Sequence, residues 1–133
     1  MQIVAALFIE EIDVREVPGP STRLDLSGVH FSVMASGELP LLWTPHLVVI
    51  VRCPAGSDGN DVLEVVYTRD GVQIARNVQY LQVEPGKFSF RLVRAELQFE
   101  DYSTVEAHCR LGDGPTTVVP YALLAPAPAP ADE

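Results

Sequence analysis

Alternation of apolar and polar residues between positions 96 and 121 constrains the fold more than any other feature of this sequence. Its apolar positions are Leu97, Phe99, Val105, Ala107, Cys109 and Leu111. A period of two residues is typical of a strand with one buried face. Turn residues occupy positions 112–115, and one more strand is expected at 116–121. The stretch therefore predicts a strand, a polar corner, a second strand, a tight turn and a last strand, as in many β-sandwiches.

The rest of the chain repeats short strand signals separated by turn residues. Strands are expected at residues 3–9, 24–36, 46–53, 62–68, 72–83 and 87–93, with loops at 13–23 and 54–60. Asp70-Gly71 between two alternating runs favours a hairpin, and a change of parity along the second run predicts a bulge at Arg76-Asn77. These signals predict an all-β fold, an antiparallel two-sheet β-sandwich of about eight strands.

Length and composition favour one domain followed by a tail. A chain of 133 residues is long enough for a single core, and we expect that domain to span residues 1–124. Residues 125–133 form an Ala-Pro repeat with an acidic end. Because such a segment has no apolar surface to bury, we expect a disordered, solvated tail that folding does not require.

The charge of the chain bears on its partners and its location. Nine basic against eighteen acidic residues give a net charge of −9, which argues against binding to nucleic acid or to an anionic membrane. No apolar run approaches the length of a membrane span. The first apolar run lacks a preceding basic region and is followed by Glu10-Glu11, so it is interpreted as a strand and not as a signal peptide. A cytoplasmic location is therefore predicted.

The two cysteines, Cys53 and Cys109, are expected to stay reduced in the cytoplasm. Each is in phase with the apolar residues of its own predicted strand, so both thiols should point into the core. The chain has no CxxC motif and no Cys/His cluster with the spacing of a zinc site. We expect two buried free thiols and no metal centre.

The histidines and acidic residues of the sequence do not form a recognisable catalytic motif. His30, His46 and His108 each fall on a different predicted strand, and no nucleophile elbow accompanies them. The acidic loop at 58–64 lacks the spacing of a calcium loop, and neighbouring acids on a strand point to opposite faces. The prediction is no catalytic site, no cofactor and no metal, hence not an enzyme.

Leu41, Leu42 and Trp43 lie between Pro40 and Pro45 and form the candidate docking segment. Missing amide hydrogens at the two prolines exclude an ordinary central strand here. One interpretation is a rigid apolar loop that docks a partner, since aromatic residues often anchor interfaces. The other, which we favour because a single Trp is usually mostly buried, is a plug over one end of the core.

The order of these parts resembles an uncharacterised family of small bacterial β-sandwich proteins. The similar segments are "VAALFIEEIDV", "LDLSGVHFSV", "HLVVIVRC", "YTRDGVQIA" and "LQFEDYSTVEAHC". The resemblance implies an immunoglobulin-like fold and carries over no functional residue. The first functional hypothesis is a non-catalytic structural or interaction module for a protein partner or a second copy of the chain, as a subunit of a larger assembly. The alternative is a β-sandwich that binds a small ligand, a sugar or a peptide.

Overall fold

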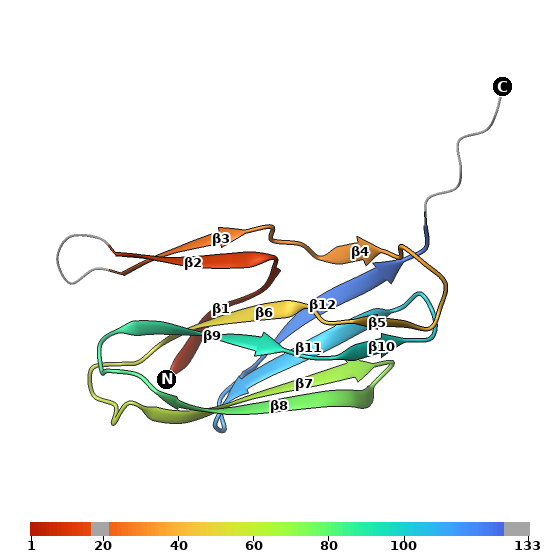
Figure 1. Ribbon diagram of the computed structural model, residues 1–133. Coiled ribbons are helices and arrows are strands. Elements are labelled where there is room, and N and C mark those ends of the chain that lie inside the picture. Colours follow the sequence, from red (N-terminus) through yellow and green to blue (C-terminus); the bar gives the residue numbers. More distant parts are fainter. Residues whose placement is uncertain (17–21, 127–133) are drawn as a thin grey trace.

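The structure, a computed structural model, describes residues 1–16 and 22–126. Within these ranges the chain is all-β, with twelve strands and no helix (Figure 1). The strands are β1 (Gln2–Ile9), β2 (Glu11–Glu16), β3 (Thr22–Ser27), β4 (Ser32–Met34), β5 (Leu41–Trp43), β6 (His46–Arg52), β7 (Asn60–Arg69), β8 (Val72–Gln82), β9 (Phe88–Arg94), β10 (Leu97–Phe99), β11 (Thr104–Leu111) and β12 (Thr116–Leu124). Most of the predicted tail, residues 127–133, lies outside the described residues.

The described strands form four sheets. A five-stranded sheet has the order β4-β12-β11-β7-β8, and a three-stranded sheet has the order β1-β6-β9. The strands β5 and β10 pair with each other, as do β2 and β3. Every pairing is antiparallel except that of β4 with β12, which is parallel. The predicted antiparallel all-β class is thus confirmed apart from this one pair.

The predicted number of about eight strands is too low, and the predicted loop at 13–23 is wrong at both ends, where residues 13–16 and 22–23 belong to strands. Turn residues occupy only the middle of that loop, at 17–21, which lie outside the described residues. On either side, Ile12 pairs with Leu26 and Val14 with Leu24, which makes β2 and β3 a hairpin. In Figure 1 this hairpin lies on one side of the three-stranded sheet, and β7 and β8 lie on the other. Strand β5 was not predicted either, and the predicted strand at 24–36 is divided into β3 and β4; β4 and β5 have only three residues each.

The pairs β5–β10 and β6–β9 share one register. Leu47 lies opposite Val93, and four residues away Trp43 lies opposite Leu97. The two pairings are therefore two parts of one ladder, which is interrupted at Thr44-Pro45. Because Pro45 has no amide hydrogen, it cannot donate to a ladder at this position. The prediction that the prolines prevent one continuous strand here agrees with the structure.

The hairpin at Asp70-Gly71 is confirmed, with positive φ angles of 51° and 78° at these residues. The predicted bulge at Arg76-Asn77 is wrong, since the register shift lies between Tyr67 and Thr68, closer to the turn. That prediction assumed that all apolar residues of the second run face the core. Instead Val72 and Ile74 are exposed, so no later change of parity is needed.

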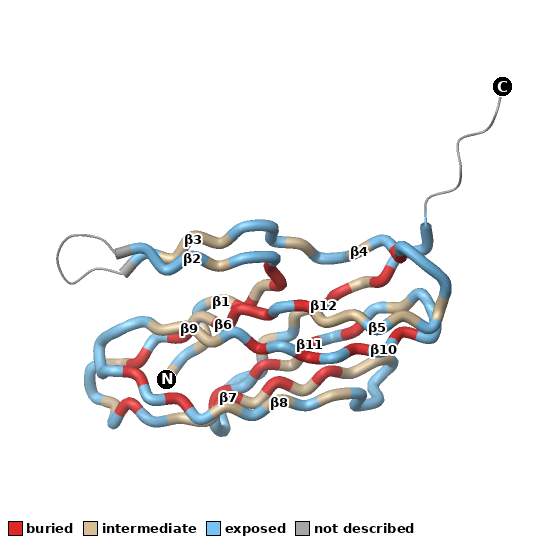
Figure 2. The backbone as a smooth tube through the Cα atoms, viewed as in Figure 1, coloured by how far each residue is buried: buried red, intermediate tan, exposed pale blue. Residues whose placement is uncertain are grey.

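One continuous core takes side chains from both of the larger sheets. Leu47 and Val49 from β6 and Val65 and Tyr67 from β7 belong to the same buried cluster. All six apolar positions of the alternating stretch are buried in it, as the sequence predicts (Figure 2). Cys53 and Cys109 are also buried there, and both are free thiols. Desolvation raises the pKa of the Cys109 thiol to about 12, so that thiol stays protonated at neutral pH.

Candidate functional site

The predicted docking segment is strand β5, and its three residues do not share one face. Leu41 and Trp43 pack against the core, whereas Leu42 is 58% exposed. The two inward side chains follow the alternation of a strand and agree with the plug interpretation. Of the three residues, Leu42 alone presents most of its side chain to a partner. Docking through this segment therefore remains a prediction that rests on Leu42.

Trp43 belongs to an aromatic cluster around Tyr121, a fully buried residue of β12. The rings of Phe8 and Tyr121 lie 4.8 Å apart, and the Trp43 ring stacks on Tyr121 at 6.5 Å. The Tyr121 hydroxyl and Nδ1 of His30 form a hydrogen bond of 2.8 Å. The cluster thus joins β1, β5, β12 and the segment that precedes β4.

The environment of Tyr121 keeps its hydroxyl protonated. Burial raises the pKa of Tyr121 to about 12, and the negative charge of Glu10 acts in the same direction. The indole N–H of Trp43 acts against this shift in pKa, although its geometry does not reach that of a hydrogen bond. At neutral pH the protonated hydroxyl can either donate to His30 or accept from it, depending on the tautomer of the imidazole.

A pocket of about 350 Å³ opens beside this cluster. Its lining combines apolar residues with carboxylate, imidazole and hydroxyl groups, namely Ile9, Glu10, His30, Ser32, Val33, Trp43, Thr44, Pro45 and His46. No lysine or arginine is among these lining residues. The fold brings His30 and His46 to this one pocket, although the sequence places them on separate strands. Polar groups that converge around an aromatic ring are typical of small-ligand sites.

Gly28 leaves room for the Glu10 side chain at the edge of this pocket. The backbone N–H of Glu10 donates to the carbonyls of Ser27 and Gly28, each at 3.1 Å. A Cβ atom built on Gly28 would lie 2.6 Å from the Glu10 carboxyl carbon. The positive φ of Gly28, 68°, is also one that residues with a side chain rarely adopt. Glycine at this position therefore leaves space for the observed position of the Glu10 carboxylate.

The second candidate site is the outer face of β6 and β9, on the side opposite the core. The strand pairings place one set of apolar side chains on this face and the neighbouring part of β1, and Val48 in its middle is fully buried; the set is Ala5, Leu7, Val48, Ile50, Phe88, Phe90 and Leu92. Phe88 is 59% exposed and Leu92 is 41% exposed. Contiguous apolar side chains on an exposed sheet face are a common mark of an interface.

Two arginines flank this outer face. Arg52 lies opposite Phe88 at one end, and Arg94 lies opposite His46 at the other. Neither guanidinium has an ion pair or a hydrogen bond with any residue that the structure describes. The outer face of β6 and β9 therefore carries two unpaired positive charges on a chain of net charge −9.

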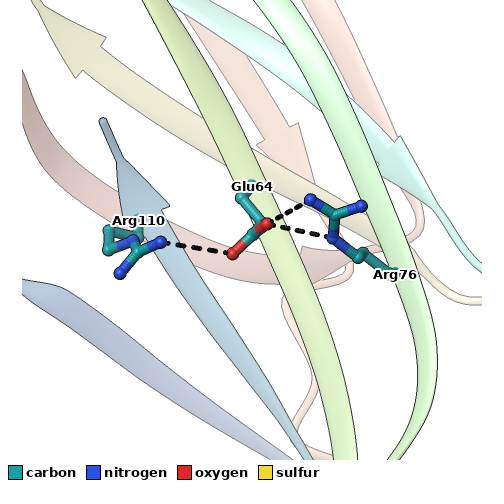
Figure 3. Close-up of polar contacts among 3 residues, drawn as sticks. All are labelled: Glu64, Arg76 and Arg110. Atoms are coloured by element: carbon teal, nitrogen blue, oxygen red, sulfur yellow. Dashed lines mark hydrogen bonds and ion pairs between the residues drawn. The ribbon is translucent and has the colours of Figure 1, made fainter. Parts of the chain in front are cut away.

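The outer face of the five-stranded sheet has a different arrangement, with paired charges. Figure 3 shows Glu64 of β7 between Arg76 of β8 and Arg110 of β11. The Arg76 guanidinium donates to a Glu64 oxygen at 2.6 and 2.9 Å, and Arg110 lies 3.5 Å from the other oxygen. Since these charges satisfy one another, they are less available to a charged partner than Arg52 is.

The other sequence candidates are dispersed. His108 is hydrogen-bonded through Nε2 to the Thr68 hydroxyl at 3.0 Å, away from both of the other histidines. Within residues 1–16 and 22–126, no three His, Cys, Asp or Glu side chains lie close enough to hold a metal ion. Sequence reasoning missed the contact of His30 with Tyr121, which lies 91 residues further on and leaves no local signal.

Comparisons with protein-family models, curated proteins and solved structures found no match to this chain. Over the part of the chain that the structure describes, no helix has the length and apolar character needed to cross a membrane.

Proposed function

We propose that this protein is a non-catalytic interaction module whose protein partner binds the outer face of β6 and β9. The observation that carries the proposal is the exposure of Phe88 and Leu92 beside the half-buried Ile50 and Phe90. Aromatic side chains at the centre of such a patch supply much of the binding free energy in protein interfaces. The patch belongs to regular strands, so it is held rigidly before the partner arrives.

The partner is a protein segment that presents apolar side chains flanked by carboxylates. Arg52 and Arg94 have no partner among the described residues, and carboxylates would satisfy both guanidinium groups through paired hydrogen bonds. The rest of the chain is strongly acidic, which disfavours a second copy of the chain by repulsion between like charges. Charge complementarity therefore favours a different protein over self-association.

For the fold, we propose a two-sheet, immunoglobulin-like β-sandwich over residues 1–124. We also propose that the protein works in the cytoplasm as part of a larger assembly. A core shared by the five-stranded and three-stranded sheets supports the sandwich. Two buried free cysteines support a reducing compartment, where thiols persist.

The test compares two exposed aromatic residues on opposite faces. Full-length protein captures partners from an extract of its own cells, and the captured protein is then purified. Its affinity is measured for the wild type, for Phe88→Asp and for the control Tyr80→Asp. Tyr80 is 82% exposed on β8, so both variants place the same charge at an exposed position. We expect about a thirtyfold loss of affinity for Phe88→Asp, the scale of an interface hot spot, and little change for Tyr80→Asp.

Salt dependence provides the second measurement. Raising the ionic strength should slow association, and Arg52→Gln should reduce this dependence because one of the complementary charges is gone. Equal affinities of the Phe88 and Tyr80 variants would overturn the proposed face. Self-association of the wild type that Phe88→Asp abolishes, measured by sedimentation, would replace the separate partner with a second copy.

A further inference from the structure

We infer that the pocket beside Tyr121 binds an organic cation, an alkylammonium or guanidinium group, either free or at the end of a lysine or arginine side chain. This inference does not depend on the outer face of β6 and β9. It rests on the Glu10 carboxylate, on the exposed part of the Trp43 ring and on hydrogen-bond acceptors that line the same pocket.

Glu10 supplies the only formal charge among the lining residues. Its carboxylate makes no ion pair with any residue in the described ranges, and the absence of a side chain at Gly28 leaves the space that the Glu10 side chain occupies. Arg94 lies across from the lining residue His46 in the sheet, but it does not line the pocket. An unpaired carboxylate in a chain of net charge −9 attracts cations and repels anions.

The exposed part of Trp43 selects for a cation in a second way. The side chain is partly exposed, yet its Nε1 atom is buried without a hydrogen-bond partner. The part of the indole that solvent can reach is therefore carbon and has no N–H donor. A cation near the face of a tryptophan is attracted by the π electrons of the ring, whereas an anion would need the buried N–H.

His30 can complete the site as an acceptor. When its Nδ1–H donates to the oxygen of Tyr121, at 2.8 Å, the neutral ring carries its lone pair on Nε2. Ser32 and Thr44, which carry hydroxyl groups, line the same pocket. An ammonium group has three N–H donors and no acceptor, so it needs a set of oxygen and nitrogen acceptors of this kind.

Trp43 is the single tryptophan of the chain, so its fluorescence reports on this pocket directly. The wild type is titrated with n-butylammonium, with neutral n-butanol and with butyrate, which have chains of similar length. We expect a saturable change in emission for the ammonium at millimolar concentration and none for the other two. A parallel titration with an N-acetyl-lysine amide tests whether the cation comes from a lysine side chain. If a partner's lysine is the ligand, this compound should bind at least as tightly as n-butylammonium does.

Two variants of equal charge test the role of Glu10. Glu10→Gln should weaken ammonium binding about fivefold, the scale of one partly exposed charge contact. Glu106→Gln makes the same change in net charge at an exposed position of β11, away from the pocket, and should bind like the wild type. Equal binding of ammonium and butanol, tighter binding of butyrate, or equal affinities of the two variants would each overturn the inference.

Discussion

Gly28 and Gly71 both have positive φ angles, but only Gly28 supports a candidate site. A side chain at Gly71 would meet no atom within 4 Å, so Gly71→Ala should cost only backbone strain, about 1–2 kcal/mol of unfolding free energy. Gly28→Ala should cost at least as much, and it should also displace Glu10. Denaturant titrations measure the stability of both variants. Butylammonium binding should weaken in Gly28→Ala alone, and equal binding by the two variants would contradict the role of Gly28.

At the scale of single residues, the sequence predicts burial better than it predicts sites. Alternation correctly places Leu97, Phe99 and Cys109 in the core, because period two is a property of neighbouring residues. It fails at Ile74, where an apolar residue lies on the exposed face of β8. The contact of His30 with Tyr121 depends on how distant strands pack, and no local pattern records that.

At the scale of elements, two side chains of the five-stranded sheet contact the edge strands β9 and β10. Gln79 of the edge strand β8 donates through Nε2 to the Leu92 carbonyl of β9 at 3.2 Å. Arg69, at the end of β7, donates to the Gln98 carbonyl of β10 at 2.7 Å. These contacts satisfy carbonyl groups on strand edges that would otherwise be open to another chain.

Arg69→Met tests this link. Besides its hydrogen bond, Arg69 lies 5.0 Å above the centre of the Phe99 ring, so methionine should lose both contacts but keep the aliphatic packing. We expect the unfolding free energy to fall by about 1–2 kcal/mol. Arg15→Met, which removes an exposed ion pair with Asp25, is the control and should change stability by less than about 1 kcal/mol. Equal effects of the two variants would contradict the proposed link.

The strands and hairpins also show which local sequence patterns are sufficient to predict an element. The Asp70-Gly71 hairpin is predictable because a two-residue turn fixes its own geometry. The β2–β3 hairpin was missed because turn residues near its centre dominate the local pattern. Strands β4 and β5 are too short for periodicity to reveal, and each exists because a partner strand, β12 or β10, lies beside it.

At the scale of the whole molecule, the core should make the protein sensitive to alkali. Desolvation raises the pKa of Cys109 from 9.0 to about 12 and that of Tyr121 from 10.0 to about 12, and it raises the pKa of Tyr67 as well. The folded chain thus holds these protons more tightly than the unfolded chain does. The corresponding stability is complete below about pH 9 and is lost as the pH rises from 9 to 12.

Denaturant titrations between pH 7 and 12 measure this loss. In Cys109→Ala the contribution of the thiol is absent, so the decline relative to pH 7 should be smaller and should begin nearer pH 10, where the tyrosines of the unfolded chain ionise. Identical pH profiles for the variant and the wild type would show that the thiol does not contribute.

The parallel pairing of β4 with β12 has a consequence for the time course of biosynthesis. Ser32 lies opposite Ala122, so strand β4 leaves the ribosome some ninety residues before its partner does. Strand β1 also has no partner until β6 has been translated, since Gln2 pairs with Arg52. A nascent chain must therefore carry β1 unpaired until β6 has been translated and β4 unpaired until β12 has been translated, and pairing between such distant segments is intrinsically slow. The step that completes the five-stranded sheet becomes available only after β12 has been translated.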